Sequence, residues 1–196
     1  TAATELAFFH YRWKTRAGFT RKAKQMRFTA FGAKKEHEDP FSRVGDITYI
    51  SPYHINDNWY PTIFRRAIKE RPEFIHGYPS CVSRFVEYMR KEAKTMPSVK
   101  GIFLASEVVL PEYISTISEV FPGIPVIFHY GLSETTNLGW GEIEKSNIVY
   151  SCEQCYGYSE TLVHPDGYHE IVGTSYWNSL MPLIRYRTQD YSKISE

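Results

Sequence analysis

The sequence predicts an α/β fold, in which a doubly wound, mostly parallel sheet with flanking helices is followed by an antiparallel β region. Two observations support this. Between residues 58 and 131, short apolar runs alternate with stretches of helical spacing in the order β-α-β-α-β. After about Tyr150 the pattern changes to short strands separated by turn residues. The 196 residues are enough to bury a sizeable core, so one domain, or a large piece of one, is the simplest expectation.

The first fifty residues predict a helix, two strands and a loop. Leu6, Phe9 and Trp13 have helical spacing, which predicts a helix over residues 4–17. Residues 24–31 alternate between polar and apolar side chains and predict a strand, and residues 47–51 predict another. The polar segment 34–46 contains Pro40 and Gly45 and is expected to be a loop.

Helices and strands then alternate. A helix is expected over residues 58–70, with Pro61 in its first turn, followed by a strand over 73–78. Ser80 is a candidate cap for the next helix, whose apolar residues fall at i, i+3, i+4 and i+7. Residues 101–106 predict a strand, Pro111 begins another helix, and residues 125–131 predict the last strand of the series.

The last part of the chain predicts antiparallel strands. The segment SETLVHPDGYHEIVG (159–173) reads as a hairpin around a Pro-Asp-Gly turn. The segment MPLIRYRT (181–188) reads as a further strand. We therefore expect the antiparallel region to begin near Tyr150 and to pack beside the parallel sheet.

Composition excludes several classes of protein. A formal net charge of +1 argues against nucleic-acid binding, and no apolar run is long enough to cross a bilayer. Three cysteines and the absence of a secretory signal pattern favour a cytoplasmic location. The aromatic share of 16% is high and is explained most simply by core packing. The oligomeric state is not fixed, and a homodimer is compatible with the sequence.

Polar side chains cluster where the predicted parallel strands end. Ligands of open parallel sheets bind outside the carboxyl ends of the strands. One strand ends at Gly77, the next at Ala105, Ser106 and Glu107, and a third in the segment YGLSE, residues 130–134. The sequence therefore predicts a ligand site at this edge.

The segment YGLSE offers groups suited to a nucleotide. Gly131 would allow a close backbone approach or a positive φ, and Tyr130 could lie against a flat base. Ser133 suits a phosphate oxygen, and Glu134 is a hard oxygen ligand of the kind Mg²⁺ takes. The alternative is a tight turn in which Ser133 and Glu134 cap the next segment.

A second candidate is Asp190, just beyond the predicted strand PLIRYRT. A carboxylate there could accept hydrogen bonds from the two vicinal hydroxyls of a ribose. The alternative is an ordinary turn carboxylate paired with a neighbouring arginine.

Four segments of the chain form a recognisable series. They are FIHGYPSCVSRFVEYM (74–89), GIFLASEVVLPE (101–112), YGLSE (130–134) and MPLIRYRTQD (181–190). Together they resemble adenylate-forming enzymes, the superfamily of acyl- and aryl-CoA ligases, and they occur in the family's order across nearly the whole chain. More narrowly, they resemble the phenylacetate–coenzyme A ligase and capsular-polysaccharide ligase-like branch.

The resemblance implies a function and a role for each site residue. A carboxylic acid would be activated by ATP as an acyl-adenylate, and coenzyme A would then displace AMP. Ser133 would contact the α-phosphate, Glu134 would bind Mg²⁺, and Asp190 would hold the ribose. The adenine would be flanked by Tyr130, Gly131, Ala105, Ser106 and Glu107, and the acyl or aryl group would lie near His129 and Leu132.

The resemblance also implies which parts of such an enzyme this chain contains. Residues 1–149 would be the α/β nucleotide-binding portion of the adenylation domain, and residues 150–196 its antiparallel portion. The family's phosphate loop and its C-terminal lysine domain are not recognisable, so we expect an incomplete piece that is inactive alone. Gln189 stands where the family usually has Gly, which puts the role of Asp190 in question.

Two alternatives to this function stay open. A relative could transfer an adenylyl or acyl group to an acceptor other than coenzyme A, as in polysaccharide biosynthesis, or the chain could be a non-catalytic module with a degenerate nucleotide site. Separately, Cys152-x-x-Cys155 with His164 and His169 could suggest zinc, but a second cysteine pair is missing, and two ordinary thiols are the simpler interpretation.

Overall fold

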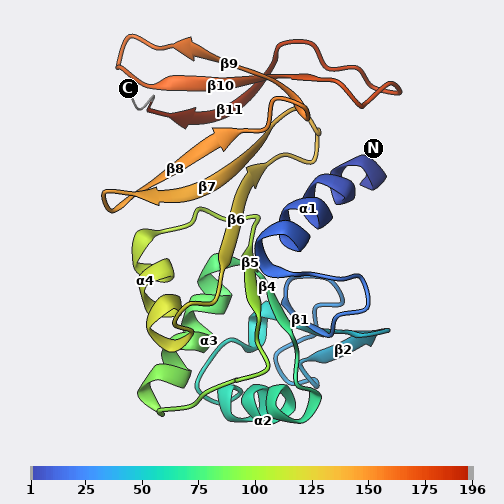
Figure 1. Cartoon of the computed structure of the whole chain (residues 1–196), viewed down its shortest axis with the longest axis vertical. Helices are drawn as coiled ribbons and strands as arrows, with labels where there is room; N and C mark the ends of the chain where they lie inside the picture. Colours follow the sequence, from blue (N-terminus) through green and yellow to red (C-terminus); the bar gives the residue numbers. More distant parts are fainter. Residues whose placement is uncertain (1, 194–196) are drawn as a thin grey trace. The chain divides into compact units, whose positions relative to one another are not determined.

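A computed structural model describes residues 2–193, with side chains from residue 3 onward. The chain forms two compact units, and each is described by itself. The α/β unit comprises Trp13–Phe128; the β unit comprises residues 2–12 and 129–193. The predicted class is confirmed, because a mostly parallel sheet with helices and a separate antiparallel sheet are both present (Figure 1). The functional division expected at residue 149 stays a prediction.

The α/β unit contains the predicted series of parallel strands. Its strands follow the order β2-β3-β1-β4-β5-β6, in which β3, β1, β4, β5 and β6 are parallel and β2 is antiparallel to β3. The elements are β1 (Gln25–Phe28), β2 (Phe41–Val44), β3 (Ile47–Ile50), a 3-10 helix (Pro52–His54), α2 (Tyr60–Glu70), β4 (Phe74–Gly77), α3 (Pro79–Lys91), β5 (Gly101–Leu104), α4 (Pro111–Val120) and β6 (Val126–Gly131).

Aromatic side chains cover both faces of this sheet. On one face, Trp13 stacks on Phe103 with ring centroids 4.3 Å apart, and Phe103 stacks on Phe74 at 5.3 Å. On the other face, Phe28 meets Phe85 of α3 at 5.3 Å, and α3 and α4 pack side by side (Figure 1). Burial from both faces explains why these strands are almost uninterrupted apolar runs in the sequence.

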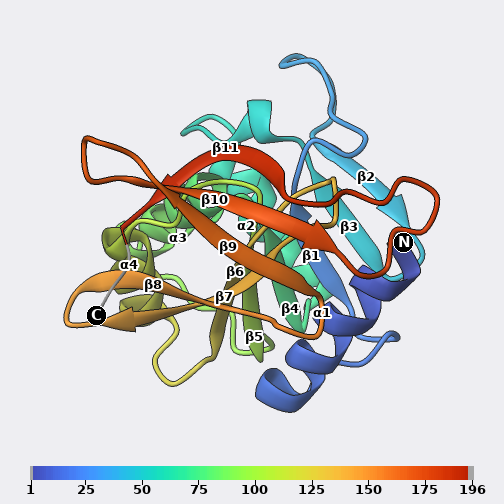
Figure 2. The same cartoon turned by 90° about the horizontal axis from the view of Figure 1, so that it is seen from above.

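The β unit contains the first part of α1 (Ala2–Ala17) and two antiparallel arrangements of strands. The end of β6 adjoins β7 (Leu138–Glu144), which pairs with β8 (Asn147–Cys152). A separate three-stranded sheet contains β9 (Gly157–Val163), β10 (His169–Ser175) and β11 (Tyr186–Ser192). Figure 2 shows β10 in the middle of this sheet, antiparallel to both neighbours. The hairpin predicted over residues 159–173 is confirmed.

The structure corrects the predicted boundaries of three strand regions. The expected loop 34–46 contains β2, which turns into β3 through Gly45 at φ +57°. The antiparallel region begins at Leu138 rather than near Tyr150. The strand expected over 181–188 lies instead at Tyr186–Ser192, because the ladder with β10 runs between these residues. Each error concerns a partner strand that local periodicity does not reveal.

The predicted cap of α3 is also wrong. Tyr78 occupies the cap position in extended conformation, and Pro79 begins the helix. Ser80 lies inside the first turn, where its backbone N–H needs an acceptor from elsewhere. Among residues 2–193, no helix is long and apolar enough to cross a membrane.

Two glycines allow the three-stranded sheet to contact the segment before β7. A Cβ on Gly157 would lie 2.1 Å from the Thr136 carbonyl oxygen, and one on Gly173 would lie 2.0 Å from Asn137 Oδ1. Asn137 is buried, and its Nδ2 donates to Ser159 Oγ at 2.7 Å. The glycines therefore keep open the space in which Asn137 bonds to the sheet.

We expect Gly157→Ala to destabilise the protein by about 2 kcal/mol or more, because backbone on both sides must move to admit the methyl group. The measurement is the free energy of unfolding in denaturant. Gly131→Ala is the control, since its Cβ would meet nothing closer than 3.6 Å. Equal stability of the two variants would show that the backbone near Gly157 can admit a methyl group without loss of stability.

Candidate functional site

The carboxyl edge of the α/β unit brings two predicted segments together. Ala105 donates its backbone N–H to the Gly77 carbonyl at 3.2 Å. Glu107 Oε2 accepts the backbone N–H of Ser80 at 3.1 Å, so this carboxylate is the acceptor for the first turn of α3. A negative charge at a helix N-terminus is favourable. Ala105 is buried, whereas Ser106, at φ +70°, and Glu107 are exposed at the edge.

In the β unit, Ser133 and Glu134 are the central residues of a tight turn. The backbone N–H of Thr135 donates to the Leu132 carbonyl at 3.0 Å, which closes the turn. The turn leads to β7 and not to a helix. Ser133 is exposed and Glu134 half-buried, as the central positions of a turn allow. The tight turn that we considered as the alternative is therefore observed. The same turn leaves the side chains of Ser133 and Glu134 at least partly exposed.

Gly131 does not have the positive φ that we considered. Its backbone lies outside the left-handed region, and a Cβ there would make only ordinary contacts. It is exposed at the end of β6. Close approach of a ligand to Gly131 stays a prediction.

Two hydrogen bonds join the YGLSE segment to β11. Tyr130 Oη donates to Asp190 Oδ2 at 2.8 Å, and Tyr186 Oη donates to Glu134 Oε1 at 3.0 Å. We call Tyr130, Glu134, Tyr186 and Asp190 the tyrosine–carboxylate cluster. The two bonds thus join the same two segments, which contain Glu134 and Asp190, 56 positions apart in the chain.

The carboxylates in this cluster affect the tyrosines. Burial raises the pKa of Tyr130, and the hydrogen bond to Asp190 raises it further. The hydrogen bond to Glu134 raises the pKa of Tyr186. Both hydroxyls therefore keep their protons at neutral pH and act as donors to the carboxylates.

We expected Asp190 to lie just beyond a strand, but it lies inside β11. The register of β10 and β11 shifts between Glu170 and Val172, so β11 contains a bulge. Gln189 in this bulge has φ +63°. Asp190 donates its backbone N–H to Thr188 Oγ1 at 3.0 Å, and Thr188 Oγ1 donates to the Ile171 carbonyl at 2.8 Å. The bulge thus sets where Asp190 projects.

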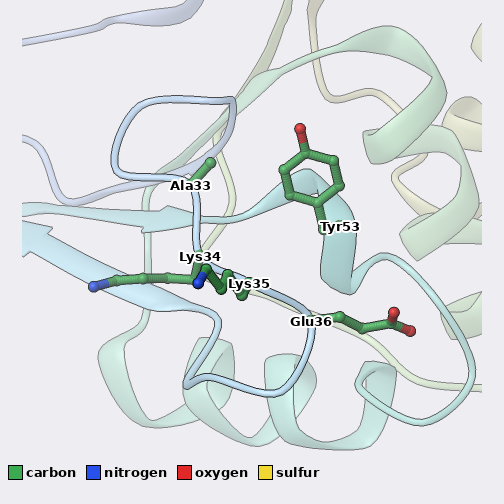
Figure 3. Close-up of a pocket in the computed structure, with 5 residues that line it drawn as sticks. All are labelled: Ala33, Lys34, Lys35, Glu36 and Tyr53. Atoms are coloured by element: carbon green, nitrogen blue, oxygen red, sulfur yellow. The ribbon is translucent and has the colours of Figure 1, made fainter.

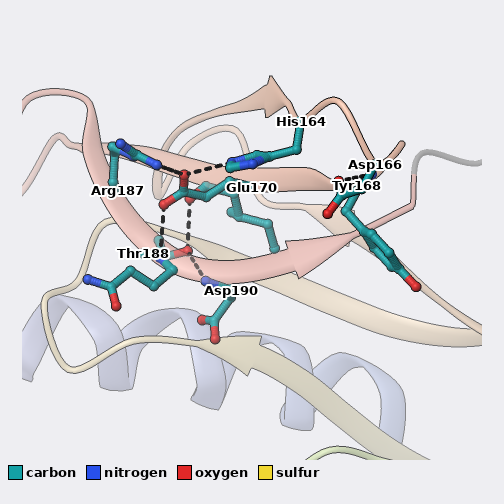
Figure 4. A network of polar contacts seen from close by, with 9 residues as sticks. His164, Asp166, Tyr168, Glu170, Arg187, Thr188 and Asp190 are labelled. Carbon is teal, nitrogen blue, oxygen red and sulfur yellow. Dashed lines mark hydrogen bonds and ion pairs between the residues drawn. The ribbon is translucent and has the colours of Figure 1, made fainter.

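The sequence reasoning missed Glu170, a buried carboxylate on β10. Its Oε2 accepts from Arg187 Nε at 2.9 Å, its Oε1 accepts from the Gln189 backbone N–H at 3.3 Å, and His164 Nε2 lies 3.5 Å from Oε2 (Figure 4). Hydrogen bonds from Arg187 lower the pKa of Glu170. A carboxylate two residues from buried Val172, on the buried phase of a strand, is the signal that could have revealed it.

His129 is enclosed by aromatic rings. Its ring centroid lies 4.5 Å from that of Phe9 and 5.8 Å from that of Trp140. Part of its surface remains accessible, yet burial of the imidazole lowers its pKa to about 4. His129 is therefore neutral at pH 7. Leu132, the other residue expected near an acyl group, is half-buried in the turn.

The described residues fit Mg²⁺ only through Glu134 and ligand oxygens. Within residues 2–193, no three His, Cys, Asp or Glu side chains are grouped to hold a metal ion. Mg²⁺ commonly takes one carboxylate together with substrate phosphates and water, which Glu134 could supply. Among the same described residues, Cys152 and Cys155 are exposed free thiols and are not grouped with His164 and His169 as zinc ligands.

Two hollows lie in the α/β unit, away from these residues. One of about 490 Å³ is lined by Ala33, Lys34, Lys35, Glu36 and Tyr53 (Figure 3). A more extended groove of about 760 Å³ lies along α2, α3 and α4. Neither includes a candidate residue, so the ligand site expected at the carboxyl ends of the strands stays a prediction.

Comparison with known proteins shows the fold. No protein-family model matches the chain, and neither does any curated protein sequence. A solved structure of 2-hydroxyisobutyryl-CoA ligase with 2-HIB-AMP and CoA matches with a TM-score of 0.62 at 16% identity, over 95% of this chain and 44% of that one. The chain thus spans less than half the length of this structure.

Two further solved structures share the fold. The anthranilate CoA ligase AuaEII in complex with anthranoyl-AMP matches with a TM-score of 0.56 at 12% identity, over 86% of this chain and 34% of that one. A fatty acid AMP ligase from Legionella pneumophila matches with a TM-score of 0.54 at 14% identity, over 97% of this chain and 44% of that one. The chain therefore has the fold found in acid ligases that form adenylates.

His129 should make the protein sensitive to acid. Because its folded pKa lies below the unfolded value of about 6.5, its contribution to stability is present above pH 6.5 and is lost as the pH falls toward 4. His129→Gln should therefore lose less stability between pH 7 and pH 4, by up to about 3 kcal/mol. Denaturation at both pH values measures this, and parallel losses in the two proteins would contradict it.

Gln189 should be strained. A non-glycine residue in the left-handed region costs about 1 kcal/mol, partly offset when glycine adds entropy to the unfolded chain. We expect Gln189→Gly to raise the free energy of unfolding by about 0.5 kcal/mol, and Gln189→Ala to give no gain. Chemical denaturation distinguishes them; an equal gain from alanine would mean that the side chain, not the backbone angle, is unfavourable.

Proposed function

We propose that this chain is part of a ligase that activates a carboxylic acid with ATP as an acyl-adenylate and then transfers the acyl group to coenzyme A. The observation that carries the proposal is the tyrosine–carboxylate cluster, whose two hydrogen bonds join the segment containing Glu134 to the strand containing Asp190. The order of the four sequence segments and the fold shared with acid ligases support it.

Each side chain of the site has a role in this proposal. Glu134 would hold Mg²⁺ against the phosphates, Ser133 would contact the α-phosphate, and Asp190 would accept from the ribose hydroxyls. His129, neutral and enclosed by Phe9 and Trp140, would lie with Leu132 near the acyl group. The adenine would be flanked by Tyr130, Gly131, Ala105, Ser106 and Glu107.

The reaction needs positioning and charge neutralisation more than acid–base chemistry. An oxygen of the substrate carboxylate attacks the α-phosphorus of ATP, pyrophosphate leaves, and the thiol of coenzyme A then displaces AMP from the acyl carbon. Glu134 would hold Mg²⁺, which when bound would supply positive charge that offsets the negative phosphates. Tyr186 would keep Glu134 oriented toward that ion, and Tyr130 would do the same for Asp190.

The finer assignment rests on the sequence segments. We place the chain in the phenylacetate–coenzyme A ligase-like branch because the Tyr-Pro-Ser and Ala-Ser-Glu segments resemble it. The contact of Ser80 with Glu107 agrees with two such segments acting together. In this proposal residues 1–149 form the nucleotide-binding portion and 150–196 the antiparallel portion of one adenylation domain. The whole enzyme would be cytoplasmic, would act on a small-molecule acid without binding nucleic acid, and could be a homodimer.

One alternative keeps the adenylation step and changes the acceptor. The structural similarity to a fatty acid AMP ligase favours this second candidate, since that protein is named for AMP and not for coenzyme A. Transfer to an acceptor in polysaccharide biosynthesis belongs to the same class. The non-catalytic alternative is weakened, because Gln189 has a left-handed backbone angle that glycine could also take.

The test is exchange of pyrophosphate into ATP by the full-length protein with a panel of aryl, fatty and amino acids. We expect exchange with at least one acid, and Glu134→Gln should lower kcat by roughly 100-fold. Glu144→Gln, at the exposed end of β7, is the matched control and should retain activity. Adding coenzyme A and detecting a thioester separates the two candidates. No exchange with any acid would overturn the proposal.

A further inference from the structure

We propose that Glu170 is a positioning residue that aims Asp190 at the ribose of ATP. It touches no predicted ligand group itself, and nothing in the sequence pattern or in the resemblance assigns it a role. The inference rests on the proposed function, because it concerns how the ribose carboxylate is held.

The geometry of Glu170 is that of an anchor for β11. Its side chain has no exposed surface, and both of its oxygens are used. Oε2 accepts from the guanidinium of Arg187, and Oε1 accepts from the backbone N–H of Gln189 (Figure 4). One carboxylate thus binds the residues on either side of Thr188, across the bulge.

Each of the three residues before Asp190 is hydrogen-bonded to β10. Arg187 and Gln189 bond to Glu170, and Thr188 Oγ1 donates to the Ile171 carbonyl while accepting the Asp190 N–H. Asp190 is the next residue, and its carboxylate accepts from Tyr130. The direction of the Asp190 side chain therefore depends on the anchored backbone before it.

If position 170 served only to fill buried space, an apolar residue would be sufficient there. An ionised carboxylate without exposed surface is costly unless charged and hydrogen-bonded partners surround it, and an apolar side chain would avoid that cost. Only an acceptor group can bind the Gln189 N–H and the Arg187 fork together. The N–H of Gln189 lies where the register of β10 and β11 shifts, and it donates to Glu170 Oε1. This requirement favours a positioning role over a packing role.

The test compares ATP with 2′-deoxy-ATP in pyrophosphate exchange by the full-length protein. Wild type should prefer ATP, because the deoxy analogue leaves Asp190 with an unpaired oxygen. Glu170→Gln keeps the volume but removes the charge that holds Arg187, so the preference, as a ratio of kcat/KM values, should fall roughly tenfold. The KM of the carboxylic acid should stay unchanged. Asp190→Asn should lower the same ratio.

A matched control breaks another ion pair of the same sheet. Arg185 Nε lies 3.3 Å from Glu160 Oε2. Glu160→Gln removes this pair and leaves the segment from Arg187 to Asp190 intact, so its ATP preference should equal that of wild type. Melting temperatures of all variants report any general loss of stability, which would lower activity with both nucleotides equally.

The outcomes separate the two proposals. A Glu170→Gln protein that is less active but keeps the wild-type preference overturns the positioning role alone. If Glu170→Gln does not fold, Arg187→Lys keeps the positive charge and loses the fork, and an unchanged preference in that variant also overturns the role. If wild type shows no exchange with any acid, the proposed function and this inference fail together.

Discussion

The hydrogen bonds from Tyr130 to Asp190 and from Tyr186 to Glu134 are the constraint on which the candidate site depends. Each bond joins a residue of the YGLSE segment, residues 130–134, to a residue of β11, and in each a neutral hydroxyl orients a carboxylate. The contacts of Asn137 with the three-stranded sheet bring the same parts of the chain together, and these two bonds fix the carboxylates within them. With them, one carboxylate suited to a cation and one suited to a ribose are held within the same cluster.

The bulge in β11 shows how this arrangement tolerates an unusual residue. Glycine would take the left-handed angle at position 189 without strain, but Gln189 takes it as well. The Gln189 N–H bonds to Glu170, and Thr188 bonds to β10, so the surrounding contacts impose the angle on a residue that disfavours it. A glutamine in place of glycine at position 189 therefore changes the local free energy. The position of Asp190 is still determined by the contacts of β11 with β10.

A comparable arrangement occurs in the α/β unit. The carboxylate of Glu107 accepts the N–H of Ser80 in the first turn of α3, and β4 and β5 are further joined where Ala105 bonds to Gly77. In both units, therefore, an acidic side chain binds backbone N–H groups of a neighbouring element. The acids that hold the backbone, Glu107 and Glu170, are distinct from Glu134 and Asp190, whose partners are tyrosine hydroxyls.

By itself, the sequence determined the alternation of helices and strands in the α/β unit, the hairpin of β9 and β10, and the segments containing Glu134 and Asp190. Those features follow from periodicity, turn residues and motif order, all of which are local. Only the tertiary structure decided that β2 and β7 are strands, that β11 begins at Tyr186, and that Glu170 is buried beneath the bulge. These depend on which distant strand supplies hydrogen bonds, and a pairing partner leaves no periodic signal in the segment that it pairs with.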